Sequence, residues 1–278
     1  MKNILKIMLM MITIFTIAGS AVYAAEIPVS DQDQLITSND WTEISNLQDE
    51  MKKEEPDATI DYDKALKVYV DCNLIKLQTA DTKKLTSALE SANYVWVIPF
   101  KMEKTYGMFT VAKGLPLSEE AKSVLTKAEQ EEVKNHAGKW MITEIAEHTV
   151  EPYYDILLEK REALSDCTRV VLVGSQPGMR QPVALGMDDE TARIWISLGY
   201  QYPVMEKIPE TQNVESGVYS FESVAEISDT YIEDSEVSTG VGVQSRSSMK
   251  YVAGIGIVLI GGILILSVLK KKKIKSED

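Results

Sequence analysis

The amino-acid sequence predicts an α+β fold: a largely antiparallel sheet with helices packed on one face, followed by one transmembrane helix near the C-terminus. Three observations support this prediction. Short apolar runs separated by turn residues recur within residues 58–200, as in strands joined by hairpins. Between them lie longer segments whose apolar residues recur with the helical period. Nineteen uncharged residues, 251–269, are then followed by four lysines.

Residues 1–24 have the layout of a secretory signal peptide. Two lysines precede a continuous apolar run, 7–18, and Val22 and Ala24 occupy the −3 and −1 positions of a cleavage site. A first transmembrane helix or a buried core helix is the alternative. The run is short for a membrane span, so we interpret it as a signal peptide.

Residues 250–269 are predicted to form the transmembrane helix, and residues 270–278 a basic cytoplasmic tail. At about 1.5 Å per residue, the uncharged run matches the ~30 Å hydrocarbon core of a bilayer. A core helix with a solubilising tail is the alternative, but this length is typical of a span. The positive-inside rule then predicts a single-pass protein of the cell membrane, with residues 25–249 extracytoplasmic and the C-terminus cytoplasmic. The basic anchor consists of Lys270, Lys271, Lys272, Lys273 and Lys275.

The extracytoplasmic part is strongly acidic. Residues 25–249 hold 21 Lys and Arg against 40 Asp and Glu, a net charge of −19. Such a surface repels nucleic acid and anionic lipid headgroups, because both are themselves negative. We therefore exclude nucleic acid as a partner and expect a protein or small ligand outside the cell.

Residues 25–57 are predicted to be an acidic segment with one amphipathic helix. Asp40 is placed to cap this helix, with Glu43 at the third helical position. The helix could dock on the main domain or bind a partner, and docking is the favoured interpretation. Its apolar stripe consists of Trp41, Ile44, Leu47 and Met51.

Residues 58–200 are predicted to form the extracytoplasmic α+β domain. The expected order is a strand, a helix, a hairpin, a long helix, a shorter helix and three strands: 65–72, 81–93, 93–114, 117–140, 152–164, 168–174, 181–187 and 191–199. This order resembles the PAS or Cache-type sensory layout. The resemblance implies a fold and no function, since no motif residue accompanies it.

Residues 201–249 are predicted to form an acidic stalk that leads to the membrane. Between Glu206 and Glu236 there are nine acidic residues and a single basic one. High charge with few large apolar residues favours an extended linker. Three aromatic residues interrupt this stretch and could mark a short docked strand: Tyr219, Phe221 and Tyr231.

The sequence carries no catalytic, cofactor-binding or metal-binding motif. His136 and His148 belong to no HExxH motif and lack partners at zinc-ligand spacing. The short stretches 61–63 (Asp-Tyr-Asp) and 188–190 (Asp-Asp-Glu) lack calcium-loop spacing, so we interpret their acids as solvated turn residues, with weak calcium binding as the alternative. Four tyrosines could form a sugar-binding platform, although packing is favoured: Tyr153, Tyr154, Tyr200 and Tyr202.

Cys72 and Cys167 are the only cysteines, and export would place them where a disulfide can persist. Cys72 follows the first predicted strand and Cys167 precedes the strand 168–174. If these strands are antiparallel neighbours, the end of one lies beside the start of the other, and the two sulfurs can approach. Two buried free thiols are the alternative.

These patterns favour a membrane-anchored surface protein that acts as a non-catalytic binding or interaction module. A ligand-sensing or accessory domain is the second hypothesis, and its tail of nine residues would require a membrane partner for signalling. A surface hydrolase using two carboxylates is a third, because such a pair needs no sequence motif.

Overall fold

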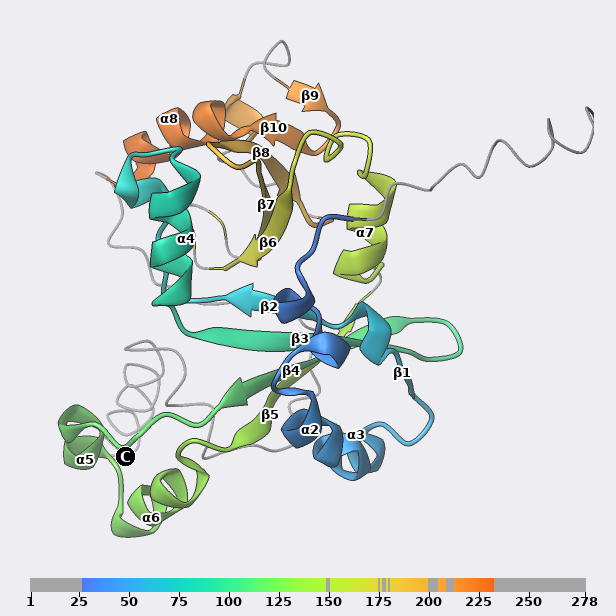
Figure 1. Ribbon diagram of the computed structural model, residues 1–278. Coiled ribbons are helices and arrows are strands. Elements are labelled where there is room, and N and C mark those ends of the chain that lie inside the picture. The colour runs from blue at the N-terminus through green and yellow to red at the C-terminus, as the bar shows by residue number, and fades with distance from the viewer. Residues whose placement is uncertain are drawn as a thin grey trace, which may run out of the picture.

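The computed structural model describes residues 27–148, 151–174, 176, 179, 181–199, 205–208 and 213–232, and one large sheet runs through it (Figure 1). The strands follow the order β5-β4-β3-β2-β6-β7-β8-β10-β9, with β1 paired to β3. The fold is thus mixed α+β with a mostly antiparallel sheet. The strands are β1 (Thr59–Ile60), β2 (Leu66–Tyr69), β3 (Tyr94–Lys101), β4 (Tyr106–Lys113), β5 (Trp140–His148), β6 (Arg169–Val173), β7 (Val183–Met187), β8 (Ala192–Ser197), β9 (Asn213–Glu215) and β10 (Val218–Ser220).

Two antiparallel meanders make up this sheet. Strands β2 to β5 pair in sequence order, and so do β6 to β8, to which β10 and β9 are added. The meanders meet at β2 and β6, which pair in parallel through Val68 with Leu172 and Tyr69 with Val173. The predicted hairpin and the last three predicted strands are confirmed as β3–β4 and β6–β8. Strand β5 was not predicted, since apolar residues occupy both of its faces.

The helices are short. The predicted long helix 117–140 is wrong, because the chain is extended at Leu125 and begins a second helix after Thr126. Thr126 and Glu129 form a capping box, in which each side chain bonds the backbone N–H of the other residue. The α-helices are α2 (Trp41–Ile44), α3 (Gln48–Glu54), α4 (Thr82–Glu90), α5 (Glu119–Val124), α6 (Lys127–His136), α7 (Tyr153–Glu159) and α8 (Phe221–Ile232). The 3-10 helices are η1 (Asp31–Asp33), η2 (Leu35–Thr37), η3 (Ser45–Leu47), η4 (Tyr62–Lys64), η5 (Ile75–Leu77) and η6 (Met205–Lys207).

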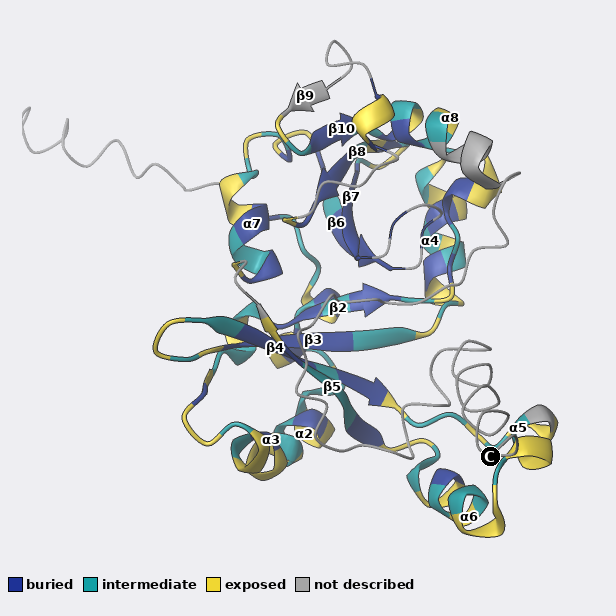
Figure 2. Ribbon diagram, turned by 180° about the vertical axis from the view of Figure 1, so that it is seen from behind, coloured by how far each residue is buried: buried dark blue, intermediate teal, exposed yellow. Residues whose placement is uncertain are grey.

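Helices cover both faces of the β6–β8 meander, so the predicted placement on one face is wrong. Successive residues of a strand point to opposite faces. Val171 and Val173 of β6 share a core with α4 and α8, whereas Val170 and Leu172 share a core with α7. Figure 2 shows the buried strands lying between α4 and α8 on one side and α7 on the other.

The N-terminal segment docks on the other meander, as favoured from the sequence. Ile44 of α2 and Met51 of α3 are fully buried against a core that includes Trp96 and Phe109. This core lies on the same face of the sheet as α4, because Lys67 pairs with Trp96 while Tyr69 pairs with Val173. One face of the sheet therefore carries two apolar cores, with β2 between them.

The predicted stalk is wrong over the part of it that the structure describes. Strand β10 pairs with β8, and α8 follows it directly. Val218, Phe221 and Val224 are buried, and the Phe221 ring lies 5.9 Å from that of Trp195. The folded domain therefore includes Tyr219 and Phe221, two of the aromatic residues that were expected to mark a docked strand; the side chain of Tyr231 lies outside the described residues.

Several predicted segments fall outside the described residues: the signal peptide 1–24, the transmembrane helix 250–269 and the tail 270–278. Among the helices that the structure describes, none combines the length and apolar character that a membrane span needs.

Candidate functional site

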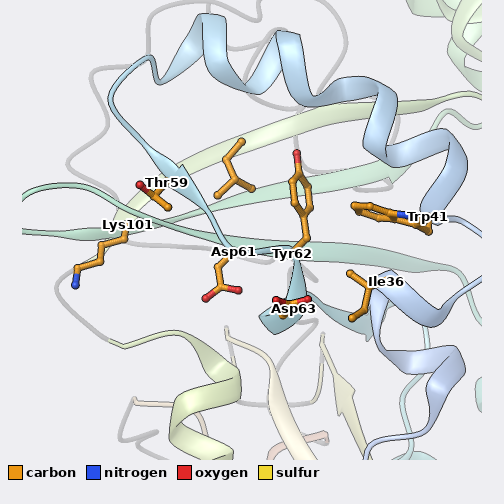
Figure 3. Close-up of a pocket in the computed structure, with 8 residues that line it drawn as sticks. Ile36, Trp41, Thr59, Asp61, Tyr62, Asp63 and Lys101 are labelled. Atoms are coloured by element: carbon orange, nitrogen blue, oxygen red, sulfur yellow. The ribbon is translucent and has the colours of Figure 1, made fainter.

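An open hollow of about 520 Å³ lies where the N-terminal segment meets β1 and the end of β3 (Figure 3). Thr59 of β1 pairs with Lys101 of β3, which places these two residues side by side at one end. Trp41, the first residue of α2, lies at the other end. The hollow is lined by Ile36, Trp41, Thr59, Ile60, Asp61, Tyr62, Asp63 and Lys101.

Aromatic and aliphatic side chains supply the apolar lining. The rings of Trp41 and Tyr62 meet edge to face, with centroids 5.2 Å apart. The Tyr62 hydroxyl lies 3.7 Å from the Met51 sulfur, and burial raises the pKa of Tyr62. Ile36 is 38% exposed although it is a large aliphatic residue. The hollow therefore exposes part of its apolar lining to solvent.

Charged side chains complete the lining. They differ in whether an opposite charge lies close to them. Lys64, adjacent to the hollow, lies 2.8 Å from Asp155 and 3.8 Å from Asp61. The hydrogen bond to Asp155 raises the pKa of Lys64 despite partial burial. Asp63 and Lys101 are exposed, and the Lys101 ammonium lies 5.8 Å from the Tyr106 ring centroid. Lys64 is thus committed mainly to Asp155.

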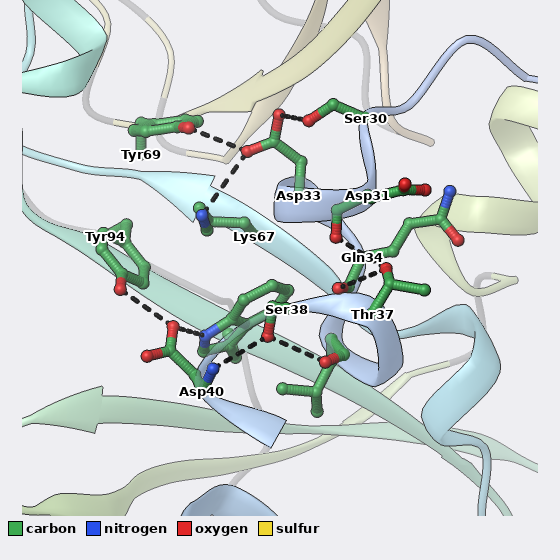
Figure 4. A network of polar contacts seen from close by, with 12 residues as sticks. Ser30, Asp31, Asp33, Gln34, Thr37, Ser38, Asp40, Lys67, Tyr69 and Tyr94 are labelled. Atoms are coloured by element: carbon green, nitrogen blue, oxygen red, sulfur yellow. Dashed lines mark hydrogen bonds and ion pairs between the residues drawn. The ribbon is translucent and has the colours of Figure 1, made fainter. Parts of the chain in front are cut away.

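A second polar cluster, here called the polar seam, lies over β2 between the two cores (Figure 4). At its centre is Asp33 of η1, only 2% exposed. Its carboxylate accepts hydrogen bonds from the Ser30 hydroxyl (2.6 Å), the Tyr69 hydroxyl (2.8 Å) and Arg169 Nη2 (2.9 Å). Burial alone would raise the pKa of Asp33, but these hydrogen bonds and the Arg169 charge lower it below its ordinary value. The seam consists of Ser30, Asp33, Asp40, Lys67, Tyr69, Tyr94, Trp96 and Arg169.

Lys67 is the least exposed cation of the seam. Its ammonium lies 3.7 Å from the Asp33 carboxylate, and its side chain is 11% exposed. The same ammonium lies 4.5 Å from the Tyr94 ring centroid and 5.3 Å from that of Trp96. Burial lowers the pKa of Lys67, against the opposing effect of Asp33 and Asp40. A carboxylate and aromatic faces together hold this lysine.

Asp40 links the polar seam to the hollow. The sequence predicted Asp40 as a helix cap, but its side chain makes no capping bond. Its carboxylate instead accepts hydrogen bonds from the Tyr94 hydroxyl (2.8 Å) and from Trp96 Nε1 (3.0 Å). Burial raises the pKa of Tyr94, and the hydrogen bond to Asp40 raises it further. Because Trp41 follows Asp40 directly, the anchoring of Asp40 on β3 also positions one end of the hollow.

The two cysteines are buried free thiols, Cys72 and Cys167. Their strands are neighbours, as the sequence suggested, but the predicted antiparallel direction is wrong: β2 and β6 are parallel. Cys72 therefore lies past the carboxyl end of β2, whereas Cys167 lies before the amino end of β6. The two residues also belong to cores on opposite faces of the sheet.

Other residues that the sequence singled out as possible site residues have structural roles. The Asp188 carboxylate closes a turn by accepting hydrogen bonds from the N–H groups of Glu190 and Thr191, and it also pairs with Arg193. His136 Nδ1 lies 2.9 Å from the Glu132 carbonyl oxygen of its own helix.

Tyr153 is buried in a core and Tyr154 packs against it, as favoured from the sequence. Tyr200, Tyr202 and the His148 side chain lie outside the described residues. No three His, Cys, Asp or Glu side chains gather as a metal site within the part of the chain that the structure describes.

Of the two short acidic stretches singled out in the sequence, only 61–63 contributes to the hollow. The other residues that line it were not identified from the sequence. The alternation of Ile60 and Tyr62 with Asp61 and Asp63 is the local signal that could have revealed a half-exposed apolar strip. Trp41 and Lys101 reach the hollow only through tertiary packing. The polar seam was missed entirely, because its members come from distant parts of the chain.

Comparisons with known proteins give no relative: no protein family matches the chain, and neither a curated protein nor a solved structure is significantly similar to it. The groups that line the hollow can make noncovalent contacts. Aromatic rings offer faces for stacking, and exposed carboxylates and an ammonium can orient a charged group.

Proposed function

We propose that the chain is a single-pass, membrane-anchored extracytoplasmic protein that acts as a non-catalytic binding module, with the hollow as its ligand site. The observation that carries this proposal is the position of Trp41. Trp96, Trp140 and Trp195 are buried, whereas Trp41 alone among the four tryptophans is only partly buried: it packs against the core beneath α2 and α3 and also lines the open hollow. Tryptophan is enriched at the energetic centres of binding surfaces.

The composition of the lining supports recognition of a ligand. Pockets of roughly 300–1,000 Å³ with mainly apolar walls and a few charged groups are typical of ligand sites. Here Ile36, Trp41 and Tyr62 supply the apolar surface, while Asp63 and Lys101 remain exposed to contact charged groups of a ligand.

The sequence supports the membrane location. The uncharged run 251–269 has a spanning length, and the basic tail 270–278 favours the cytoplasmic side. The signal-peptide layout of residues 1–24 supports export of the folded domain. The hollow would then face the outside of the cell, where a partner protein or small ligand can reach it.

Protease treatment of intact cells tests the location. We expect external protease to remove residues 25–249 and to leave a small membrane fragment that contains residues 250–278. Disruption of the membrane should produce the same cleavage of the domain, together with loss of the tail. Protection of the entire chain in intact cells would contradict the proposed orientation.

Site-specific photo-crosslinking tests the ligand site. A benzophenone amino acid replaces Thr59, an exposed residue of the hollow, or Asp49, an exposed residue of α3 outside it. On irradiated cells we expect a cross-linked product from position 59 that is lost when Trp41→Ala is added, and none from position 49. Equal cross-linking from both positions, or none from position 59, would exclude the hollow as the contact site.

A further inference from the structure

We infer that the hollow binds an extended segment of a partner protein in which a Lys or Arg residue and a large apolar residue lie two positions apart. This inference rests on the proposed function and names the chemistry of its ligand. Three observations carry it: the exposed apolar surface, the arrangement of charges along the hollow, and the way in which the same molecule already holds a lysine.

The apolar end of the hollow requires a large apolar side chain. Ile36 is 38% exposed, and Trp41 and Tyr62 lie beside it as an edge-to-face pair. Covering this surface with an aromatic or long aliphatic side chain removes apolar area from water. A small hydrophilic ligand would leave the exposed parts of the Ile36 and Trp41 side chains in contact with water.

The charges are ordered along the hollow. In Figure 3, Asp61 and Asp63 lie between Lys101 at one end and Trp41 at the other. Lys64 is held closer to Asp155 than to Asp61, so it does not cancel both hollow carboxylates. A cationic side chain placed at Asp61 and Asp63 therefore lies next to the apolar end and away from Lys101.

The polar seam shows that this fold can hold a lysine with the same chemical groups. There a carboxylate of Asp33 and the rings of Tyr94 and Trp96 surround the Lys67 ammonium. The hollow presents two carboxylates together with a Trp and a Tyr ring, but it is open to solvent. Carboxylates and aromatic faces both attract ammonium and guanidinium groups.

The overall charge favours the same partner. Residues 25–249 carry a net charge of −19, which attracts basic segments and repels acidic ones. A protein segment also explains why two unlike subsites adjoin, because alternate residues of an extended chain point to the same face and present two different side chains to it. We therefore assign the hollow to a basic and apolar protein segment.

Fluorine NMR of the full chain in lipid nanodiscs tests this assignment. The protein is labelled with 5-fluorotryptophan, which gives four resonances, and Trp41→Phe identifies that of Trp41. Three blocked tetrapeptide probes are titrated, and in each of them one alanine separates the two test residues: phenylalanine and lysine in the first, phenylalanine and glutamate in the second, and alanine and lysine in the third.

We expect the phenylalanine–lysine probe to shift the Trp41 resonance at about 1.4- to fivefold lower concentration than the phenylalanine–glutamate probe, since an exposed charge pair contributes about 0.2–1 kcal/mol. The alanine–lysine probe should also need a higher concentration, because it buries less apolar area. Asp63→Asn should reduce the preference for lysine over glutamate. Asp49→Asn removes an equal charge outside the hollow and should leave the preference unchanged.

The outcomes separate the inference from the proposed function. If both phenylalanine probes shift Trp41 equally, the hollow binds ligand but the cationic assignment is overturned. If the alanine–lysine probe matches the phenylalanine–lysine probe, the apolar assignment is overturned. If no probe shifts Trp41, this ligand class is overturned, and the photo-crosslinking result at position 59 then decides separately whether the hollow is a binding site at all.

Discussion

Asp33 Oδ2 accepts a hydrogen bond of 2.9 Å from Arg169 Nη2, although the two residues lie 136 positions apart in the sequence. This contact ties the N-terminal segment to β6 across the join between the two meanders. Val29 forms an isolated parallel bridge with Val170 beside it. The N-terminal segment is therefore held by the centre of the sheet as well as by the core beneath α2 and α3.

Replacement of Asp33 by Ala should be strongly destabilising. It leaves the cations of Lys67 and Arg169 largely buried without their carboxylate, and breaking such a pair from one side costs about 3 kcal/mol or more. Urea unfolding, followed by tryptophan fluorescence, measures the change. The matched control is Asp31→Ala, an exposed acid in the same 3-10 helix, which should change the free energy of unfolding by less than about 0.5 kcal/mol. Equal effects of the two variants would contradict a central role for Asp33.

Acid should weaken the fold through Asp33. Its folded pKa lies below its unfolded value, so the unfolded chain binds more protons between the two values and stability falls as pH falls. The contribution of Asp33 is therefore complete above the unfolded pKa of about 3.9 and is lost as pH drops through the lower folded pKa. Asp33→Asn cannot ionise, so it should show a shallower loss of stability below about pH 4. The same slope in both proteins would argue against this linkage.

Phe221 should contribute to the stability of the domain. It is 4% exposed and its ring lies 5.9 Å from that of Trp195. Phe221→Ala should lower the free energy of unfolding by about 3 kcal/mol, through lost burial and the cavity that remains. Glu222→Ala, at the next and exposed position, should have little effect. If Phe221→Ala is as mild as the Glu222 variant, residues 218–224 contribute little to the fold.

Both cysteines should be present as thiols that react slowly in the folded protein. Burial raises the pKa of Cys72, and it raises that of Cys167 to about 11, so little thiolate forms at neutral pH. Mass spectrometry after alkylation should find two labelled cysteines per chain in denaturant without reductant, and far slower labelling without denaturant. A chain that takes up label only after reduction would instead contain a disulfide.

Local sequence patterns predicted the strands well where alternation or continuous apolar runs were clear. The hairpin of β3 and β4 and the strands β6 to β8 follow such runs. Strand β5 was missed because polar and apolar residues do not alternate simply along it, for example around Glu144 and Ile145. The helix break at Thr126 was missed because apolar residues continue past it, although the capping box with Glu129 is visible in the sequence.

Spatial relationships were much harder to predict than the elements. Alternation shows which residues of a strand share a face, but it does not show which helix covers that face or whether a distant strand pairs in parallel. The direction of β6 against β2 therefore could not be inferred, and the cysteine prediction failed with it. The sequence singled out residues 61–63, which line the hollow, but it gave no sign that Trp41 and Lys101 lie beside them in the folded chain.

The parallel join between β2 and β6 has a consequence for the order of folding. Each meander forms between strands that are close in sequence, whereas Val68 and Leu172 pair across 104 positions. Because closing a long loop is entropically costly and slow, we expect this join to form last. The Gly174 amide, which donates to the Tyr69 carbonyl oxygen at 2.8 Å across the join, should then gain protection from hydrogen exchange later than amides within the β3–β4 hairpin. The chain would pass through a state of two small sheets, and the contact of residues 29–33 with β6 would form only when Asp33 and Arg169 are brought together.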